Sequence, residues 1–538
     1  MSGFRNGSRS VVMKRHGLVF ALCGLSQMAS AYELHEWGTF TTVSGSGGEL
    51  LTGLHVEEEH LPPFVYSHIG MKNLNWSHRF MPQLMSSVQN GYAKNANQMF
   101  VLKGEGNKIV PMSLMKGMPM ASLSNVTVKM ETPVIYFYGD DAGKVNVKVG
   151  FNGGTISQWY PQRKSGDTPN KMTGEGFEIL PALKKELGAR EMVLYKPLDF
   201  SKMYEGGIEW DVEVIPKAES DPAFTFKADE TTTWIYPRVS DANMLKVGDE
   251  YEDFLFYRGI GNFPLPVVFS VDAEETLHVE NKSNEAVPFA FAFENIEGKF
   301  RYSVINSVEP GKTATVKETE WTTPVNQQVE VFQQMRKGLM AQGLSLEESN
   351  GMIKTWWQSY FGQPGLRVFW VVPQGELEKT LPLTLSPAPE KQVRVLVGRA
   401  DVMRPRLEKK MIAALGTHEF KKFQSDRFIL PYTNRLKQLI KEPVYQKFDA
   451  KNIMHVSLML TAKRGSSELG EGINLYENSV VKAQHLKLKG KWRVEGDDVL
   501  VIGDTHFKLD PKTGILTADA QQEGDYDVYE IQLPKVLN

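Results

Sequence analysis

The residues best suited to chemistry gather near the amino end of the chain. Half of the ten histidines that follow residue 31 lie within one stretch of 44 residues, at His35, His55, His60, His68 and His78. Neutral imidazoles and carboxylates are the ligands that zinc, iron or manganese uses where thiolates are absent. Because carboxylates are interleaved with these histidines, the stretch indicates a candidate site for a divalent transition metal.

The spacing of the side chains selects His35, Glu36, His55, Glu57 and His60 as the candidate metal ligands. In a strand over residues 55–60, the side chains of His55 and Glu57 would project from the same face. The pair His35-Glu36 lacks the second histidine of a helical HExxH zinc motif. The alternative is a solvated acidic loop with ordinary surface histidines.

Three arginines next to apolar runs form a second group of candidates. Arg238 and Arg258 each follow aromatic residues and end an apolar run, and Arg399 lies in a third such run. Guanidinium forks bind carboxylates or phosphates, and loops at strand ends commonly carry binding residues. Arg238 and Arg258 are therefore candidate ligand-binding residues. The alternative is internal pairing with buried acids such as Asp241 or Asp253.

Glu209, Asp211 and Glu213 alternate along one apparent strand. Two carboxylates that face each other across a cleft can hydrolyse a glycoside. Alternating acids on one strand are more typical of a solvated outer face, with the apolar residues between them directed inward. No catalytic residue can be assigned from these patterns.

Composition excludes several function classes. Cys23 is the single cysteine, so the chain after residue 31 can form neither disulfides nor thiolate metal sites. That part has 57 Lys and Arg against 64 Asp and Glu, a net charge of −7, which argues against nucleic acid as a partner. The sequence also lacks a glycine-rich phosphate loop, a GxSxG elbow and a CxxC motif.

The first 31 residues have the three zones of a secretory signal peptide. Four basic residues precede an apolar run at 17–25, and Ala29-Ser30-Ala31 provides a small-residue cleavage site. The apolar run of about nine residues is shorter than the roughly 20 needed to cross a bilayer. We expect cleavage before Tyr32, translation from Met1 or Met13, and a bacterial protein that is periplasmic or secreted, with no transmembrane segment after cleavage.

Hydrophobic patterning predicts a mostly β (α+β) fold. A fully apolar run at 134–138, a Gly/Asp-rich turn and an alternating run at 144–149 predict a hairpin. Short strands at regular spacing predict a β-sandwich-like region over 200–322. Further strands are expected at 366–372 and 393–397, and a β-meander is expected in the last fifty residues.

Helical patterns are concentrated after residue 322. The range 325–341 has apolar residues at near-helical spacing, and Ser345 to Glu348 has the pattern of a capping box that opens a second helix. These two helices predict a helical hairpin, and 404–415 predicts an amphipathic helix. The predicted domains are a signal peptide (1–31), an N-terminal β-rich domain (32–199), the sandwich-like domain (200–322), the helical hairpin with strands (323–416), and a connecting region with the C-terminal β-meander (417–538).

The segment Leu34 to Thr41 reads LHEWGTFT and lies just after the cleavage site. It resembles the start of a family of exported bacterial proteins of unknown function, and the stretches 130–138, 154–160, 254–259 and 367–373 are similar to the same family. The resemblance covers much of residues 32 to about 405. It implies export but no activity, cofactor or catalytic residue.

These observations favour a non-catalytic binding or structural protein of the bacterial envelope. Its partner would be another envelope protein, a glycan or a small molecule. The alternative is a metal-dependent hydrolase or oxidoreductase that uses the N-terminal histidine and glutamate cluster. A glycan-acting enzyme would need two facing carboxylates in an open groove.

Overall fold

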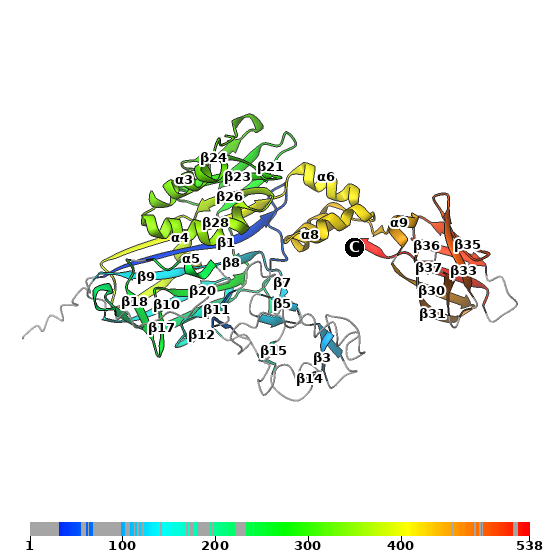
Figure 1. Cartoon of the computed structure of the whole chain (residues 1–538), viewed down its shortest axis with the longest axis horizontal. Coiled ribbons are helices and arrows are strands. Elements are labelled where there is room, and N and C mark those ends of the chain that lie inside the picture. Colours follow the sequence, from blue (N-terminus) through cyan, green and yellow to red (C-terminus); the bar gives the residue numbers. More distant parts are fainter. Residues whose placement is uncertain are drawn as a thin grey trace, which may run out of the picture.

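The fold is mostly β, with about 45% strand and 20% helix, as predicted. The computed structural model describes residues 32–54, 61–62, 64–67, 98–102, 108–111, 113–115, 118–120, 123–139, 143–167, 171–172, 177–179, 194–195, 198–220, 233–239, 241–454, 456–477, 480–483, 486, 488–519 and 526–537. A large body of packed sheets and helices is joined through α6 and α8 to a smaller C-terminal β module (Figure 1). The predicted signal peptide lies outside the described residues.

Strand β1 (Glu33–Ser44) lies inside the largest sheet and joins distant parts of the chain. It pairs in parallel with β28 (Lys391–Val402) along its full length, from Glu33 opposite Lys391 to Ser44 opposite Val402. Its other edge pairs antiparallel with β9 (Val134–Tyr138) and β8 (Val128–Met130). Almost every residue of β1 is buried, because both faces of the sheet are covered.

The large sheet has ten strands in the order β2-β11-β20-β8-β1-β28-β26-β23-β24, with β9 paired to β1 and β20. Its fully buried strands are apolar on both faces, which explains the near-continuous apolar runs in their sequences. The remaining bounds are β2 (Tyr66–Ser67), β11 (Gly154–Tyr160), β20 (Leu255–Gly261), β26 (Gly365–Val371), β23 (Ala290–Ile296) and β24 (Lys299–Ile305).

Two smaller sheets cover one face of the large sheet. Inward side chains such as Trp210 and Phe269 share one apolar cluster with Phe40 and Tyr257 of the large sheet. The six-stranded sheet contains β19 (Glu250–Glu252), β18 (Met244–Val247), β17 (Glu205–Ile215), β10 (Gly143–Asn152), β27 (Leu383–Ser386) and β12 (Ser165–Gly166). The three-stranded sheet contains β21 (Val267–Val271), β22 (Leu277–Asn281) and β25 (Thr313–Val316).

The predicted helical hairpin covers part of the opposite face. Helix α3 (Gln327–Met340) and helix α4 (Leu346–Trp356) are separated by Gly343, whose φ of +102° suits glycine. The capping box between Ser345 and Glu348 is formed as predicted. A π-helical turn, η4 (Trp357–Phe361), follows α4 directly.

The predicted hairpin at 134–149 is wrong, although both of its strands form. Strand β9 pairs with β1 and β20 in the large sheet, whereas β10 pairs with β17 and β27 in the six-stranded sheet. The reason is burial. The first four residues of β9 are all buried, so β9 suits a sheet covered on both faces, while the alternation of β10 suits a sheet with one solvated face.

The strands of residues 200–322 are distributed over three sheets and form no separate sandwich. Strands β17 to β19 lie in the six-stranded sheet, β20, β23 and β24 in the large sheet, and β21, β22 and β25 in the three-stranded sheet. Face-to-face packing of sheets is present, as expected, but its strands come from residues 33–402 together. One apolar cluster contains residues from both sides of positions 199 and 322.

The body ends in helices, and a separate β module follows. Helix α6 (Pro405–Ala414) ends before Gly416, as predicted, and α7 (Lys421–Gln424), α8 (Ile429–Leu439) and α9 (Ala450–Ile453) follow. The module is a curled antiparallel sheet with its own apolar core. Its strands are β30 (Ser457–Arg464), β31 (Ser467–Asn474), β32 (Val480–Lys482), β33 (Lys489–Glu495), β34 (Val499–Ile502), β35 (Thr505–Asp510), β36 (Ile515–Asp519) and β37 (Val528–Gln532).

The C-terminal meander is confirmed, but the sheet begins earlier than predicted, since β30 and β31 lie within the expected connecting region. No helix among the described residues has the length and apolar character needed to span a bilayer. The remaining elements are β3 (Gln98–Leu102), β4 (Lys108–Pro111), β5 (Ser113–Met115), β6 (Met118–Met120), β7 (Leu123–Ser124), β13 (Lys171–Met172), β14 (Phe177–Ile179), β15 (Leu194–Tyr195), β16 (Leu198–Asp199), η1 (Lys217–Glu219), η2 (Thr233–Ile235), η3 (Glu318–Glu320), α5 (Gln374–Thr380), η5 (His418–Phe420), β29 (Val444–Tyr445) and β38 (Lys535–Leu537).

The close packing of β28 against β26 gives a first testable prediction. A Cβ atom at Gly398 would lie 2.2 Å from Nε1 of Trp370 and 2.9 Å from Cζ of Phe40. We expect Gly398→Ala to lower the free energy of unfolding of the body by about 1–3 kcal/mol through overpacking, measured by urea denaturation. Gly472→Ala is the control, because a Cβ atom there meets nothing within 4 Å. Equal stability of Gly398→Ala and the parent chain would contradict the close packing.

Candidate functional site

The two predicted ligands on β1 lie on opposite faces of the sheet. Successive side chains of a strand point to opposite sides. His35 therefore faces the helical hairpin, where it contacts Glu348 of α4, while Glu36 faces Arg394 and Tyr257 on the other side. The structure does not bring His35 and Glu36 together around one ion.

His35 is held by a fully buried carboxylate. Its Nδ1 lies 3.0 and 3.1 Å from the two carboxylate oxygens of Glu348, and the Tyr138 hydroxyl donates to Oε1 of the same carboxylate at 2.8 Å. The backbone N–H of Ser345 donates to Oε2 at 2.7 Å. Glu348 is 0% exposed and His35 is 8% exposed, so this cluster fastens α4 to the sheet.

The other ring nitrogen of His35, Nε2, has a different environment from Nδ1. Nε2 is buried without a hydrogen-bond partner among the described residues, and the carboxylate of Glu33 lies 3.8 Å away. An imidazole oriented by a carboxylate at Nδ1 resembles the arrangement behind many metal-bound histidines. The pKa of Tyr138 is raised far above its usual value by burial and by the charge of Glu348, so the phenol stays a hydrogen-bond donor.

Glu36 is the centre of a second buried cluster. The Tyr257 hydroxyl donates to Glu36 Oε1 at 2.6 Å, and Arg394 Nε donates to Oε2 at 2.6 Å. Arg394 also reaches Glu378 and the backbone carbonyl of Leu381. Burial opposes the charged form of Arg394, but Glu36, Tyr257 and Glu378 together outweigh it and raise the pKa of Arg394. Glu36 is thus engaged in a charge-assisted network that joins β1, β20 and β28.

The other predicted metal ligands, His55, Glu57 and His60, lie outside the described residues. Of this predicted ligand set, the structure describes only His35 and Glu36. Among the described side chains, no group of three or more His, Cys, Asp or Glu residues is placed to hold a metal ion.

The two candidate arginines have separate partners. Arg238 makes a two-pronged ion pair with Glu252 at 2.9 and 2.8 Å, and Trp234 Nε1 donates to the same carboxylate at 2.9 Å. Arg258 is buried in β20, where its Nε donates to Gln158 at 2.5 Å. Arg238 therefore forms an ion pair within the protein, as the alternative interpretation expected, but its partner is Glu252 and not Asp241 or Asp253.

Asp253 is a buried carboxyl group with an unusual environment. It is 4% exposed, follows Glu252 directly, and its Oδ1 has no hydrogen-bond partner among the described residues. Burial, and then repulsion from the Glu252 carboxylate, raises the pKa of Asp253 to about 7. No local pattern in the sequence predicts that Arg238 pairs with Glu252 rather than with Asp253.

A further buried ion cluster joins β26, β28 and the helices. Asp401 lies 2.8 Å from Nε of Arg367 and 2.7 Å from Nε of Arg399, and the Arg399 guanidinium stacks 4.4 Å from the ring centre of Tyr360. Burial opposes ionisation of Asp401, but the arginines outweigh it and lower its pKa. Arg399 and Asp401 are two residues apart and so share one strand face, a spacing from which this ion pair could have been predicted. Of these two residues, only Arg399 was named from the sequence.

The acidic strand β17 has the solvated outer face that the sequence favoured. Trp210 and its apolar neighbours point into the core, whereas Asp211 and Glu213 are exposed. Glu209 bonds to Asn146 and Lys164, which lower its pKa to about 2. These carboxylates lie along one strand and do not face one another, so this strand alone lacks the facing pair that glycoside hydrolysis needs.

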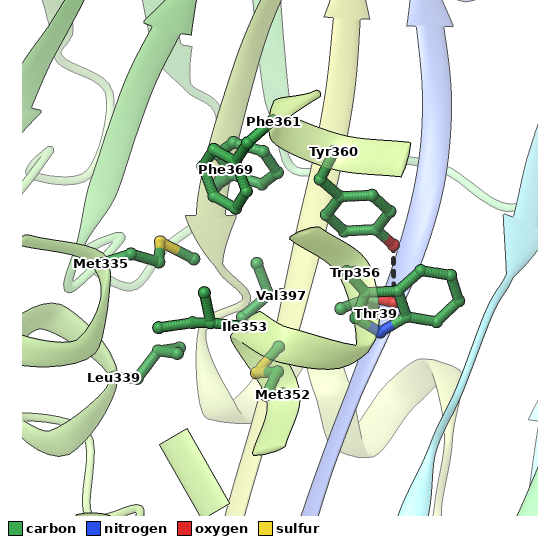
Figure 2. A pocket seen from close by; sticks show the side chains of 10 residues that line it. All are labelled: Thr39, Met335, Leu339, Met352, Ile353, Trp356, Tyr360, Phe361, Phe369 and Val397. Carbon is green, nitrogen blue, oxygen red and sulfur yellow. Dashed lines mark hydrogen bonds between the residues drawn. The ribbon is translucent and has the colours of Figure 1, made fainter. Parts of the chain in front are cut away.

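Figure 2 shows a pocket between the helical hairpin and the large sheet. Apolar side chains line it almost completely, and the Tyr360 hydroxyl donates to Oγ1 of Thr39 at 2.7 Å across its edge. Its volume is about 10 Å³, which is no more than one water molecule requires. The pocket is a small packing gap rather than a ligand site. Its lining residues are Thr39, Met335, Leu339, Met352, Ile353, Trp356, Tyr360, Phe361, Phe369 and Val397.

Neither a family model nor a curated protein matches this chain. Its function must therefore be argued from its own residues.

The carboxylate of Glu348 gives a second testable prediction. In Glu348→Gln, an amide faces His35, the Tyr138 hydroxyl and a backbone N–H with one acceptor oxygen fewer and no charge. We expect the free energy of unfolding to fall by about 2–4 kcal/mol in urea denaturation, because buried donors lose their partner. Glu347→Gln, at the exposed neighbouring position, should behave as the parent chain. If Glu348→Gln had the same free energy of unfolding as the parent chain, this cluster would not be what holds α4 against the sheet.

Asp253 gives a prediction about pH. Between pH 4 and pH 7 the folded protein keeps the Asp253 proton that the unfolded chain releases, so this group lowers stability as pH rises. Over that range the loss is roughly 4 kcal/mol at most. Asp253→Asn removes this loss, so the free energy of unfolding should fall less between pH 4 and pH 8 in the variant, as measured by urea denaturation. Parallel pH profiles would show that Asp253 does not titrate in this range.

Proposed function

We propose that the chain is a non-catalytic binding or structural protein of the bacterial envelope, either periplasmic or secreted. The observation that carries this proposal is the division of His35 and Glu36 between two faces of β1, each with its own internal partners. A catalytic or metal centre needs its groups to converge on one reacting position. His35 and Glu36, the two predicted ligands among the described residues, project from opposite faces of the sheet.

The other candidate residues support the same proposal. Arg238 is engaged by Glu252, and Glu36 is engaged by Arg394 and Tyr257. Removing one partner of a buried ion pair leaves an uncompensated charge inside the protein, so such pairs hold the elements that carry them in one arrangement. They stabilise a rigid scaffold, as a binding or structural protein requires.

The C-terminal module supports a role in binding. It has its own core and stands beside the body at the end of α6 and α8 (Figure 1). An appended β module presents its outer face to solvent, and here Met459 and Tyr476 are among the exposed apolar side chains. The partner we propose is another envelope protein, a glycan or a small molecule. Export is supported by the pattern of residues 1–31 and by the resemblance of the LHEWGTFT segment.

A metal-dependent hydrolase or oxidoreductase is the second candidate function. It is favoured by one observation, the Nε2 atom of His35, which has no hydrogen-bond partner among the described residues and lies 3.8 Å from the Glu33 carboxylate, while Nδ1 is held by Glu348. In this alternative His35 would bind a divalent transition metal through Nε2, and Glu348 would orient the ring.

Elemental analysis of the processed protein separates the two candidates. The full chain is expressed in a Gram-negative host, recovered from the periplasm without a histidine tag, and analysed for bound zinc, iron, manganese and copper. We expect recovery of a chain that begins at Tyr32 and metal contents at background, also after each ion is added back.

The matched variants are His35→Ala and Glu36→Gln, which alter opposite faces of β1. Near-stoichiometric metal that is lost in His35→Ala and kept in Glu36→Gln would overturn the non-catalytic proposal in favour of a metal centre. Retention of the unprocessed chain in the cytoplasm would overturn the envelope location.

A further inference from the structure

The body and the C-terminal module have separate apolar cores. The module core is formed by residues from Phe448 to Leu533. A separate cluster of the body includes Phe428 and Leu436 together with strand residues such as Val43. Since each part buries its own apolar surface, contacts at the junction fix how the two parts are oriented rather than whether each part folds.

The chain crosses this junction twice. Residues 444–447 lead from the body to the module, and residues 534–537 return from the module to the body. The two crossings pair as strands β29 and β38, with Val444 opposite Leu537 and Tyr445 opposite Lys535. The backbone N–H of Gln446 also donates to the carbonyl of Pro534 at 2.8 Å.

The returning strand inserts an apolar side chain into the body. Leu537 is 4% exposed and belongs to the same cluster as Phe428 and Leu436, not to the module core. Strand β38 accordingly lies beside α8 in Figure 1. The last strand is thus attached to the body by packing and to β29 by hydrogen bonds.

The first crossing has contacts suited to a pivot. The backbone N–H of Lys447 donates to the carbonyl of Gly416 at 2.7 Å, and the N–H of His418 donates to Asn452 Oδ1 at 2.8 Å. Tyr445 lies between two glycines, because a Cβ atom at Gly416 or Gly514 would lie 2.6 or 2.5 Å from it. The two hydrogen bonds lie within residues 416–452, and Tyr445 adds a contact with Gly514 of the module. Leu537 provides a second attachment from the other end of the module.

We propose that residues 534–537 are a strap that sets the orientation of the C-terminal module, and that release of Leu537 lets the module turn as a rigid body about residues 440–447. The module keeps its own fold when the strap opens, because Leu537 contributes nothing to its core. A change of orientation would redirect the exposed face of the module. This inference is independent of the proposed function, since it concerns orientation and not binding.

The absence of cysteine after residue 31 makes the test direct. Val329→Cys on α3 and Met459→Cys on β30 provide two exposed labelling positions, at 46% and 53% exposure, one in each part. Distances between spin labels are measured by pulsed electron paramagnetic resonance. We expect one narrow distance distribution in the otherwise unaltered chain and a distribution at least twice as broad in Leu537→Asp.

Leu439→Asp is the matched control, because Leu439 is an exposed leucine at the end of α8. It should keep the narrow distribution, and so should the conservative variant Leu537→Ile. Should Leu537→Asp fail to fold, Leu537→Ala serves in its place and should also broaden the distribution. A narrow distribution in the Leu537 variant, a broad one in the parent chain, or equal broadening in Leu439→Asp would each overturn the proposal.

Discussion

The parallel pairing of β1 with β28 is the interaction on which the rest of the body depends. It joins residues 33–44 to residues 391–402 along the whole length of both strands, across more than 340 residues of intervening sequence. Parallel strands require a crossover connection, and here the connection contains the two smaller sheets and the helical hairpin. Both faces of β1 are therefore covered by elements whose sequences lie between β1 and β28.

This burial dictates how the charged residues of the strand must behave. A charge inside a protein needs a partner of opposite sign or several hydrogen bonds. His35 meets Glu348 on one face, and Glu36 meets Arg394 on the other. The side chains that looked most suitable for chemistry are thus the ones that fasten α4 and β28 to the central strand. The same logic holds for Asp401 between Arg367 and Arg399.

Asp253 departs from this pattern in an informative way. Glu252 accepts two hydrogen bonds from the Arg238 guanidinium, and Oδ1 of the neighbouring Asp253 has no hydrogen-bond partner among the described residues. Protonation is the remaining way to bury it, which is why its pKa rises toward neutrality. The pKa of Asp253 is thus raised, whereas the arginines around Asp401 lower the pKa of that carboxyl.

The sequence by itself determined the elements with strong local signals. The capping box at Ser345, the helix expected at 404–415 and the alternating acids Glu209, Asp211 and Glu213 each have a short-range physical cause, and each is found where it was expected. Local patterning also decided that Trp210 lies inside and Asp211 outside. The cysteine-free composition and the signal-like start are likewise properties of the sequence alone.

Tertiary structure decided which strands become neighbours and which charges meet. The runs 134–138 and 144–149 have the pattern of a hairpin, yet they belong to different sheets because burial on both faces outweighs a short connection. Glu348 lies 313 residues from His35 in the sequence, and Tyr257 and Arg394 lie 221 and 358 residues from Glu36. Such pairings depend on the register of β1 against β28, and spacing along the chain carries no information about them.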